Sequence, residues 1–366
     1  MMQGLFFYEK SRYNIFYGYN LRRYNMMETI NTGSDLEQLT TDIQIHSQIF
    51  QKVKQEIHRK IIGQELFIER LLLGVIAGGH ILIEGVPGLA KTETVKSLSQ
   101  CIGLNFQRIQ FTPDLLPADL IGTQIYKPHT NDFETKKGPI FSNLILADEI
   151  NRAPAKVQSA LLEAMAEKQV TIGSTSYKLD EPFIVLATQN PLEQEGTYAL
   201  PEAQMDRFMM KLKIDYPNRE EEKKIMNMMS LKRDTQLSQA INRDDIFRAR
   251  DLVDRIYIDE KVQDYIIDIV FATRTGEVRS SGKIHRIKEL DGLIAYGASP
   301  RASIALALAA RTHAYLQGRA YVTPQDVKSI GFDVLRQRIV MSFEAEAEDK
   351  TVDNIVSVIF DSIEVP

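Results

Sequence analysis

The chain has very little of several things, and each shortage excludes a class of protein. Its 366 residues contain a single cysteine, Cys101, so neither an internal disulfide nor a multi-cysteine metal site can form. No run of about 18 apolar residues occurs, so we expect no transmembrane segment. The net charge of −5 argues against a basic nucleic-acid surface, and we expect no nucleic-acid partner.

What is present is the composition of a globular protein. Hydrophobic residues make up 44% of the chain and charged residues 25%, which is the range of soluble domains. The length exceeds that of one ordinary hydrophobic core, so we predict two folded units. The lone Cys101 lies on a helical pattern, where we expect a core or half-buried thiol, and it is compatible with a reducing, cytoplasmic location.

Residues 1–34 form an N-terminal extension that differs from the rest. Residues 1–25 contain eight Phe or Tyr and lack the continuous apolar stretch of a secretory signal. One interpretation is that translation starts at Met26 or Met27, so that the upstream stretch is an artefact of start-site assignment. The alternative is a disordered arm that binds a membrane or a partner.

The first chemical motif is "GVPGLAKT", residues 85–92. It fits the phosphate-binding pattern G-x-x-x-x-G-K-[ST], except that Ala90 stands where the second glycine is usual. The apolar run "HILIE" precedes it, and a helical pattern that closes at Gly103 follows. In that context backbone N–H groups can hold phosphates, Lys91 can reach the outer ones, and Thr92 can bind Mg²⁺. The alternative is an ordinary strand–helix turn with a solvated lysine.

Two further apolar runs end in polar residues that suit the same chemistry. "NLILADEINRAP" ends its run at Asp148 and Glu149, which in a phosphate-loop enzyme hold Mg²⁺ and polarise the attacking water. The alternative is a pair of helix-capping acids. "EPFIVLATQNP" ends near Asn190, which can hold the lytic water or can simply form a turn before Pro191.

Together these segments resemble the MoxR family of AAA+ ATPases. The resemblance rests on "GVPGLAKT", "LADEINRAP", "LLEAMAEKQVTIG", "FIVLATQNPLEQEGTYALPEAQMDRF", "SPRASIALALAART" and "VTPQDVKSIGFDVLRQRIVMSFEAEAE", and it covers residues 36–349. It implies an α/β fold: an AAA+ P-loop α/β/α core with a parallel sheet over residues 35–217, then an all-α helical lid over 218–366. We expect residues 273–299 to form a long loop or broken segment in that lid.

The resemblance also implies roles for single residues. It makes Glu149 the catalytic carboxylate, Asn190 the first sensor, Arg207 the finger that reaches a neighbouring subunit, and Arg301 the second sensor; Arg152 lies close to Arg207 among the motifs and keeps the finger assignment open. The metal ligands are Thr92 and Asp148. The nucleotide-binding set comprises Ile62, Gly63, Gly85, Val86, Pro87, Gly88, Leu89, Ala90, Lys91 and Thr92.

Ala90 needs a physical account within this resemblance. We expect it in the first helical turn at negative φ, where a methyl group is tolerated, while Gly85 and Gly88 make the sharp turns. Two hairpin inserts are predicted, over residues 112–141 and 169–179, with Gly173 and Ser174 at the second turn. By resemblance such inserts line the pore of a ring; the alternative is surface decoration.

The implied activity is Mg²⁺-dependent ATP hydrolysis that drives chaperone-like remodelling or maturation of partner proteins. The resemblance further implies a homo-hexamer and a partner with a von Willebrand factor A domain. Two other functions stay open at this point. One is an AAA+ nucleic-acid motor or loader, and the other is a nucleotide-gated scaffold with little turnover, which would have no need of Glu149.

Overall fold

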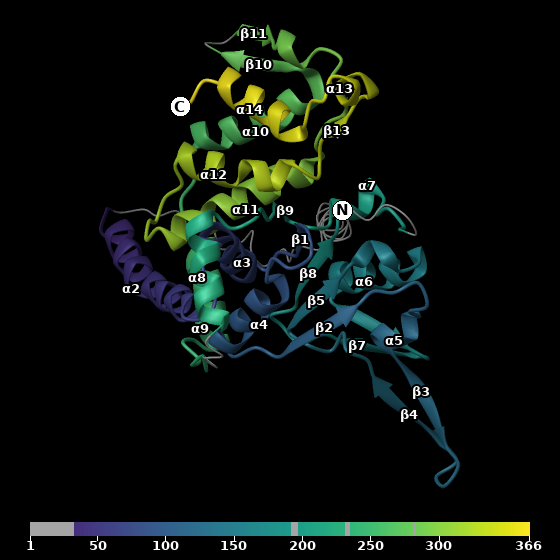
Figure 1. Ribbon diagram of the computed structural model, residues 1–366. Helices are drawn as coiled ribbons and strands as arrows, with labels where there is room; N and C mark the ends of the chain where they lie inside the picture. Colours follow the sequence, from purple (N-terminus) through teal and green to yellow (C-terminus); the bar gives the residue numbers. More distant parts are fainter. Residues whose placement is uncertain (1–32, 192–196, 231–234, 281–282) are drawn as a thin grey trace, which may run out of the picture.

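The computed structural model describes residues 33–191, 197–230, 235–280 and 283–366. Both interpretations of residues 1–25 therefore lie outside the described residues. Figure 1 shows a core built on a sheet, with a mainly helical lid above it. Among the described residues, no helix combines the length and the apolar character needed to cross a membrane.

The centre of the core is a five-stranded parallel sheet in the order β2-β5-β8-β1-β9. The strands are β1 (Ile81–Glu84), β2 (Phe106–Gln110), β5 (Leu144–Asp148), β8 (Ile184–Gln189) and β9 (Met210–Lys213). Strands β1, β5 and β8 are buried apolar runs, as expected for parallel strands covered on both faces. The predicted parallel-sheet core is confirmed.

Alternate residues of the strands enter two separate hydrophobic clusters, because successive side chains point to opposite faces of a sheet. Leu146 and Leu186 belong to a cluster with helices α2 (Gly33–His58), α3 (Glu65–Ala77) and α4 (Lys91–Cys101), and this cluster continues into the lid. Ile145 and Val185 belong to the other, with α5 (Pro117–Ile121) and α6 (Ala155–Glu167). Cys101 is fully buried at the end of α4, as predicted, and burial raises the pKa of its thiol to about 12.

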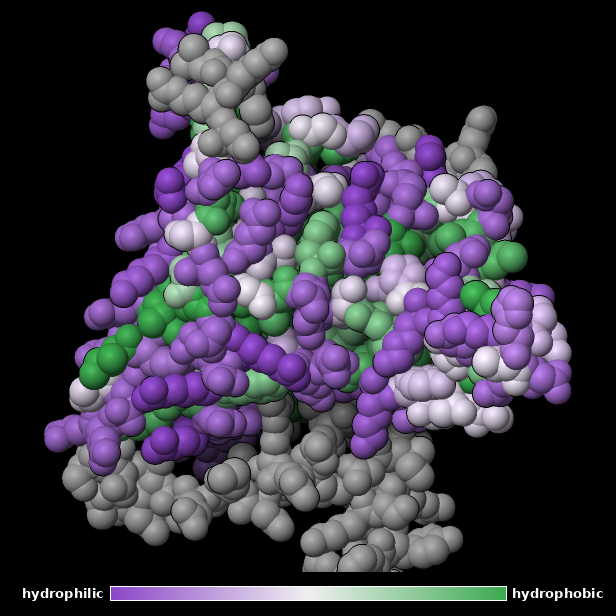
Figure 2. All heavy atoms as spheres, turned by 90° about the horizontal axis from the view of Figure 1, so that it is seen from below, coloured by the Kyte–Doolittle hydropathy of each residue, from purple (hydrophilic) through white to green (hydrophobic). Residues whose placement is uncertain are grey.

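Both predicted hairpin inserts are present. Strands β3 (Gly122–Lys127) and β4 (Asp132–Lys137) pair antiparallel, and the hairpin projects from the body of the core (Figure 1). Strands β6 (Gln169–Ile172) and β7 (Thr175–Lys178) form the second hairpin, and Gly173 at its turn has φ +62°. Figure 2 views the molecule from below and shows hydrophilic side chains predominating on this face, with hydrophobic ones in short stripes between them.

The chain beyond the sheet is mainly helical. Helix α7 (Glu202–Met205) precedes β9, and after β9 come α8 (Arg219–Ser230), α9 (Arg243–Asp254), α10 (Glu260–Thr275), α11 (Pro300–Leu316), α12 (Pro324–Leu335), α13 (Phe343–Ala347) and α14 (Val352–Ser362). The helical lid is confirmed. The boundary at residue 217 stays a prediction, since α9 packs on α3 of the core.

The lid contains short strands as well, so the prediction of an all-α lid is wrong, and residues 273–299 form a series of short elements, not a long loop. Helix α10 runs on to Thr275, and β10 (Glu277–Ser280) pairs with β11 (Lys283–Arg286). Strand β12 (Ile294–Tyr296) pairs with β13 (Val340–Met341), more than 40 residues away. The first hairpin buries Val278 but leaves Ile284 exposed, so its apolar alternation is too weak to read from the sequence.

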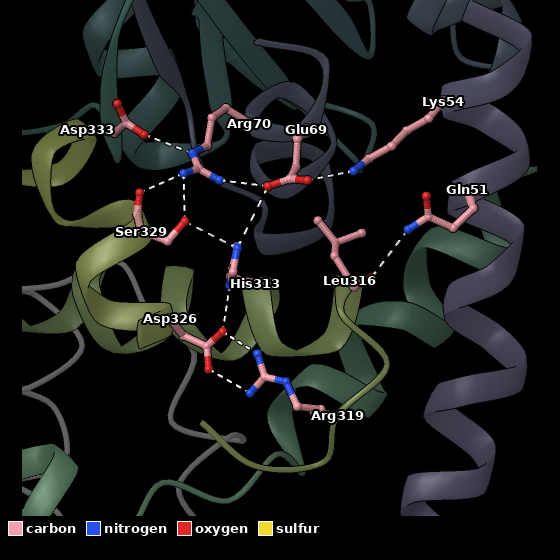
Figure 3. A network of polar contacts seen from close by, with 10 residues as sticks. All are labelled: Gln51, Lys54, Glu69, Arg70, His313, Leu316, Arg319, Asp326, Ser329 and Asp333. Atoms are coloured by element: carbon pink, nitrogen blue, oxygen red, sulfur yellow. Dashed lines mark hydrogen bonds and ion pairs between the residues drawn. The ribbon is translucent and has the colours of Figure 1, made fainter. Parts of the chain in front are cut away.

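A buried polar network joins the lid to the core (Figure 3). Arg70 of α3 donates from Nε to Asp333 Oδ2 at 2.8 Å and from a terminal nitrogen to the Ser329 carbonyl at 2.6 Å. His313 of α11 contacts Asp326 of α12, its Nδ1 lying 2.6 Å from Oδ1. Burial by itself raises the pKa of Asp326, but hydrogen bonds from neighbouring side chains outweigh it and hold this pKa below its usual range. Buried charges need such partners, so the network fixes how α3 meets the lid.

His80 precedes β1 and is buried, with backbone groups of Val185 and Met165 beside its two ring nitrogens. The Val185 N–H donates to its Nδ1 at 3.0 Å, so the proton sits on Nε2, which lies 3.3 Å from the Met165 carbonyl oxygen. Burial lowers the pKa of His80 to about 4. Protonation of Nδ1 would set two N–H groups against each other, which gives a second reason for the imidazole to stay neutral.

We expect acid to destabilise the protein through His80. Between pH 6.5, the ordinary histidine value, and about pH 4, the unfolded chain takes up a proton that the folded protein refuses, so stability falls by at most about 1.4 kcal/mol per pH unit. Above pH 6.5 this contribution is flat. Urea midpoints at pH 4.5, 5.5, 6.5 and 7.5 measure the slope.

The matched pair of variants is His80→Gln and His129→Gln, the latter at an exposed histidine in the β3–β4 turn. His80→Gln should lower stability at pH 7.5 and flatten the acid slope, whereas His129→Gln should reproduce the wild-type slope. Equal slopes in all three proteins would show that other groups cause the acid sensitivity.

Candidate nucleotide site

Residues 85–90 join β1 to α4 and form the candidate phosphate loop. Gly85 is favoured by a close approach, since an added Cβ would lie 3.1 Å from the Ile214 carbonyl oxygen, a tighter contact than most Cβ atoms make. Gly88 is required by its conformation, with φ +88° and open space around it. Val86 is half-buried and Leu89 is buried against the core, which leaves Pro87 and Gly88 exposed.

Ala90 does not adopt the conformation expected from the sequence. It is the N-terminal cap of α4 and has φ +54° and ψ +19°, so the prediction of a negative φ in the first helical turn is wrong. A left-handed alanine costs about 1–2 kcal/mol, because its Cβ comes close to the carbonyl oxygen that follows, so the contacts around the loop must offset this strain. The surrounding loop holds this conformation in place.

Gln64 is one of the groups that hold the loop, and its role was not predicted. Its Nε2 donates to the Leu89 carbonyl at 2.6 Å, and its Oε1 accepts from the Thr94 hydroxyl at 3.0 Å. Ile62 and Gly63 immediately precede it, and Gly63 lies against the side chain of Glu221. The segment predicted to contact adenine, Ile62 and Gly63, is therefore next to the phosphate loop. The sequence signal for Gln64 was its place in "IIGQ", directly after these two residues.

Lys91 is the first residue of α4. Its Nζ donates to the Gly85 carbonyl at 2.6 Å, which folds the side chain back along the loop. Partial burial lowers the pKa of this ammonium, and the charges of Asp148 and Glu149 oppose that shift. Thr92 follows and is half-buried at the same helix end. The structure thus brings the predicted lysine near both predicted carboxylates.

Asp148 and Glu149 form hydrogen bonds with the neighbouring strand β8. The Thr188 hydroxyl donates to Asp148 Oδ1 at 2.6 Å and accepts from the Glu149 N–H at 2.8 Å. Glu149 has φ +58°, so its side chain leaves the strand in a new direction. Asn190 is buried directly after β8, at the same sheet edge. Thr188 was not singled out, although it stands two residues before Asn190.

Strand β2 and Arg152 supply further contacts to these carboxylates. Arg108 donates to Asp148 Oδ2 from Nε at 2.9 Å and from a terminal nitrogen at 2.7 Å. Gln110 donates to Glu149 Oε2 at 2.8 Å, and Arg152 forms an ion pair with the same oxygen at 3.2 Å. The sequence signal for the β2 contacts was the two-residue spacing of polar side chains in "RIQ".

Arg207 and Arg301 do not lie at the carboxyl end of the sheet, but near the start of β9. Arg207 precedes β9, whose first residue, Met210, pairs with Ile81, the first residue of β1, at the amino end of the sheet. Arg301, at the start of α11, lies 3.7 Å from Asp206, the neighbour of Arg207. The loop and carboxylates follow the carboxyl ends of the strands, and β1 with its four residues spans about 13 Å. Both arginines thus lie toward the amino end of the sheet, where Arg207 contacts Leu162 and Arg301 contacts Asp206, whereas Lys91 lies at the carboxyl end.

The position of Asp206 explains why the two arginines come together. Asp206 also accepts from the Ser299 hydroxyl at 2.8 Å and from Arg338 Nε at 2.8 Å. Gln337 and Arg338 of the lid both donate hydrogen bonds to the Phe208 carbonyl. These bonds hold the backbone next to Arg207 in place. Arg207 itself is exposed and donates to the Leu162 carbonyl at 2.7 Å.

The residues at the carboxyl edge fit a nucleotide with Mg²⁺. The loop offers backbone N–H groups at a helix start beside a half-buried ammonium, which is a site for phosphate oxygens. The hydroxyl of Thr92 and the carboxylate of Asp148 are hard oxygen donors of the kind that Mg²⁺ takes alongside nucleotide phosphates. Sheet, loop and paired acids define the protein as a P-loop nucleotide-binding protein with a helical lid.

Comparisons with known proteins agree with this class. The model of a family described as "ATPase family associated with various cellular activities (AAA)" matches residues 80–210, and that of an AAA lid domain matches residues 290–359. Chaperone MoxR1 of Mycobacterium tuberculosis is 43% identical over 85% of this chain and 81% of its own length. YeaC of Bacillus subtilis, an uncharacterized protein, is 40% identical over 86% of this chain and 94% of its own.

A solved structure gives the same answer. The crystal structure of a provisionally assigned ATPase from Cytophaga hutchinsonii superposes with a TM-score of 0.82 at 47% identity, and the match covers 91% of this chain and 100% of that one. The chain belongs to the MoxR family of AAA+ ATPases.

Proposed function

We propose that the protein hydrolyses ATP with Mg²⁺ and uses the energy for chaperone-like remodelling or maturation of partner proteins. The observation that carries the first part is the convergence of Lys91, Asp148 and Glu149 at one sheet edge beside the phosphate loop. The name of Chaperone MoxR1 supports the second part. A scaffold with little turnover is disfavoured because Glu149 is positioned by two strands, which nucleotide binding alone does not require.

Each residue at this edge has a proposed task. Lys91 binds the outer phosphates once it leaves the Gly85 carbonyl, and Thr92 with Asp148 would hold Mg²⁺, which neutralises developing negative charge when bound. Glu149 takes the proton of the attacking water, and Asn190 orients that water. Ile62 and Gly63 would contact the base.

We further propose that the active site is completed by a second subunit. Arg207 and Arg301 lie toward the amino end of the sheet, away from the carboxyl end that carries the loop of their own chain, and a transferring phosphoryl group needs additional positive charge. Both would serve the nucleotide of a neighbour in a ring, for which a homo-hexamer is proposed. A partner with a von Willebrand factor A domain and a cytoplasmic location stay predictions.

Lys91→Ala tests the nucleotide site. Loss of the half-buried ammonium should weaken binding of a fluorescent ATP analogue by about a hundredfold, the scale of two charge-assisted hydrogen bonds. Lys96→Ala, at an exposed lysine of the same helix, is the matched control and should bind like the wild type. Equal affinity in all three proteins would refute the phosphate-loop assignment.

A further inference from the structure

Both Asp148 oxygens are already occupied by protein groups. Oδ1 accepts from Thr188 at 2.6 Å, and Oδ2 accepts two N–H groups of Arg108, at 2.9 and 2.7 Å. A carboxylate oxygen has two lone pairs, so the guanidinium uses both of those on Oδ2. A metal that approaches this oxygen must compete with Arg108 for it.

The Arg108 side chain is hydrogen-bonded to Asp148, but it is exposed enough to change its rotamer. Its side chain is 50% exposed on the edge strand β2, whereas that of Asp148 is 14% exposed. Its terminal nitrogen also donates to Gln110 Oε1 at 2.8 Å, and Gln110 in turn donates to Glu149. Arg108 can therefore swing into solvent while Asp148 stays fixed by Thr188.

The protein alone also offers few ligands to a metal. Within the part of the chain that the structure describes, no group of three or more His, Cys, Asp or Glu side chains is placed to hold an ion. Mg²⁺ usually binds through one or two carboxylates together with substrate phosphates and water. A positive side chain on the protein's carboxylate makes binding of the metal without nucleotide still weaker.

Building on the proposed function, we propose that Arg108 is a positioning residue that acts as a built-in counter-ion for Asp148. It neutralises and orients the carboxylate while the site holds no nucleotide, and it gives up Oδ2 to the metal that arrives with nucleotide phosphates. Arg108 thereby sets the Mg²⁺ concentration that nucleotide binding requires.

The test is a Mg²⁺ titration of full-length protein with a fluorescent, non-hydrolysable ATP analogue. Arg108→Gln removes the competing charge and should lower the half-maximal Mg²⁺ concentration by about tenfold, the scale of one hydrogen bond to a charged group. Arg108→Lys keeps the charge but loses the two-nitrogen grip, and its midpoint should fall between the two. Arg286→Gln is the matched control, since Arg286 pairs with the exposed Asp291 of the lid.

A double variant locates the effect on Asp148. If Arg108 acts through this carboxylate, Arg108→Gln should change the midpoint far less in an Asp148→Asn background than in the wild type. An unchanged or raised midpoint in Arg108→Gln overturns the proposal. Absence of analogue binding to the wild-type protein would overturn the proposed function instead, so the two failures are distinguishable.

Discussion

Replacing Arg207 with alanine should leave nucleotide binding nearly normal and slow hydrolysis by about 10³- to 10⁵-fold, the range for a finger supplied by a neighbouring subunit. Arg207 lies at the amino end of the sheet, and the phosphate loop follows the carboxyl end. Its guanidinium is exposed, where a second subunit can meet it. Phosphate release and analogue binding are measured on the same protein preparation.

Mixing two inactive variants shows whether the site is shared. In a ring of Arg207→Ala and Lys91→Ala subunits, an intact loop can face an intact arginine at some interfaces, so part of the activity should return. Specific activity should also rise with protein concentration as rings assemble. A mixture that co-assembles but stays inactive, or activity per subunit that is independent of concentration, contradicts the shared site.

Arg152 provides the internal comparison for this experiment. It forms an ion pair with Glu149 of its own chain, so it belongs to the carboxylate side and not to the exposed arginine pair. Arg152→Ala should therefore gain nothing from mixing with Lys91→Ala subunits. Recovery by that mixture, and none by the Arg207→Ala mixture, would transfer the finger role to Arg152.

Glu149→Gln should keep nucleotide binding and lower turnover by about 10²- to 10⁴-fold, the contribution of a positioned general base. The amide has nearly the same shape, so the Thr188 contact to the backbone is kept, but it cannot take a proton from water. Single-turnover phosphate release and analogue affinity separate the two effects.

The control is Glu163→Gln, at an exposed carboxylate of α6. It should hydrolyse ATP at the wild-type rate. Near-normal phosphate release by Glu149→Gln would assign the base to another residue. If hydrolysis is blocked as expected, the variant held in its nucleotide-bound state is the form with which to capture partner proteins.

The sequence by itself was enough to place the candidate nucleotide-binding residues at one edge of the sheet. Buried strands appear as short apolar runs, and "GVPGLAKT" and "LADEINRAP" stand at their carboxyl ends. Parallel strands bring those ends to one edge, so Lys91, Asp148 and Glu149 were expected together. The hairpins were equally predictable, because their strands and turns are contiguous in the chain.

Only the tertiary structure decided which groups hold these residues. The contact of Arg108 with Asp148 joins residues 40 positions apart, and that of Gln64 with Leu89 joins residues 25 apart. Such contacts depend on which strands are neighbours, and the order β2-β5-β8 is not a local property of any segment. The positive φ of Ala90 likewise depends on the loop around it, against the preference of alanine itself.

Arg207 and Arg301 show the same difference between what the sequence indicates and what the tertiary structure decides. Their motifs, "MDRF" and "SPRA", could be recognised from sequence, but their place could not. Asp206, next to Arg207, forms an ion pair with Arg301. This pair forms because hydrogen bonds from Gln337 and Arg338 hold the lid against the residues just before β9. The packing of a lid on one end of a strand lies beyond any local pattern, and it is this packing that puts both arginines at the edge opposite the phosphate loop.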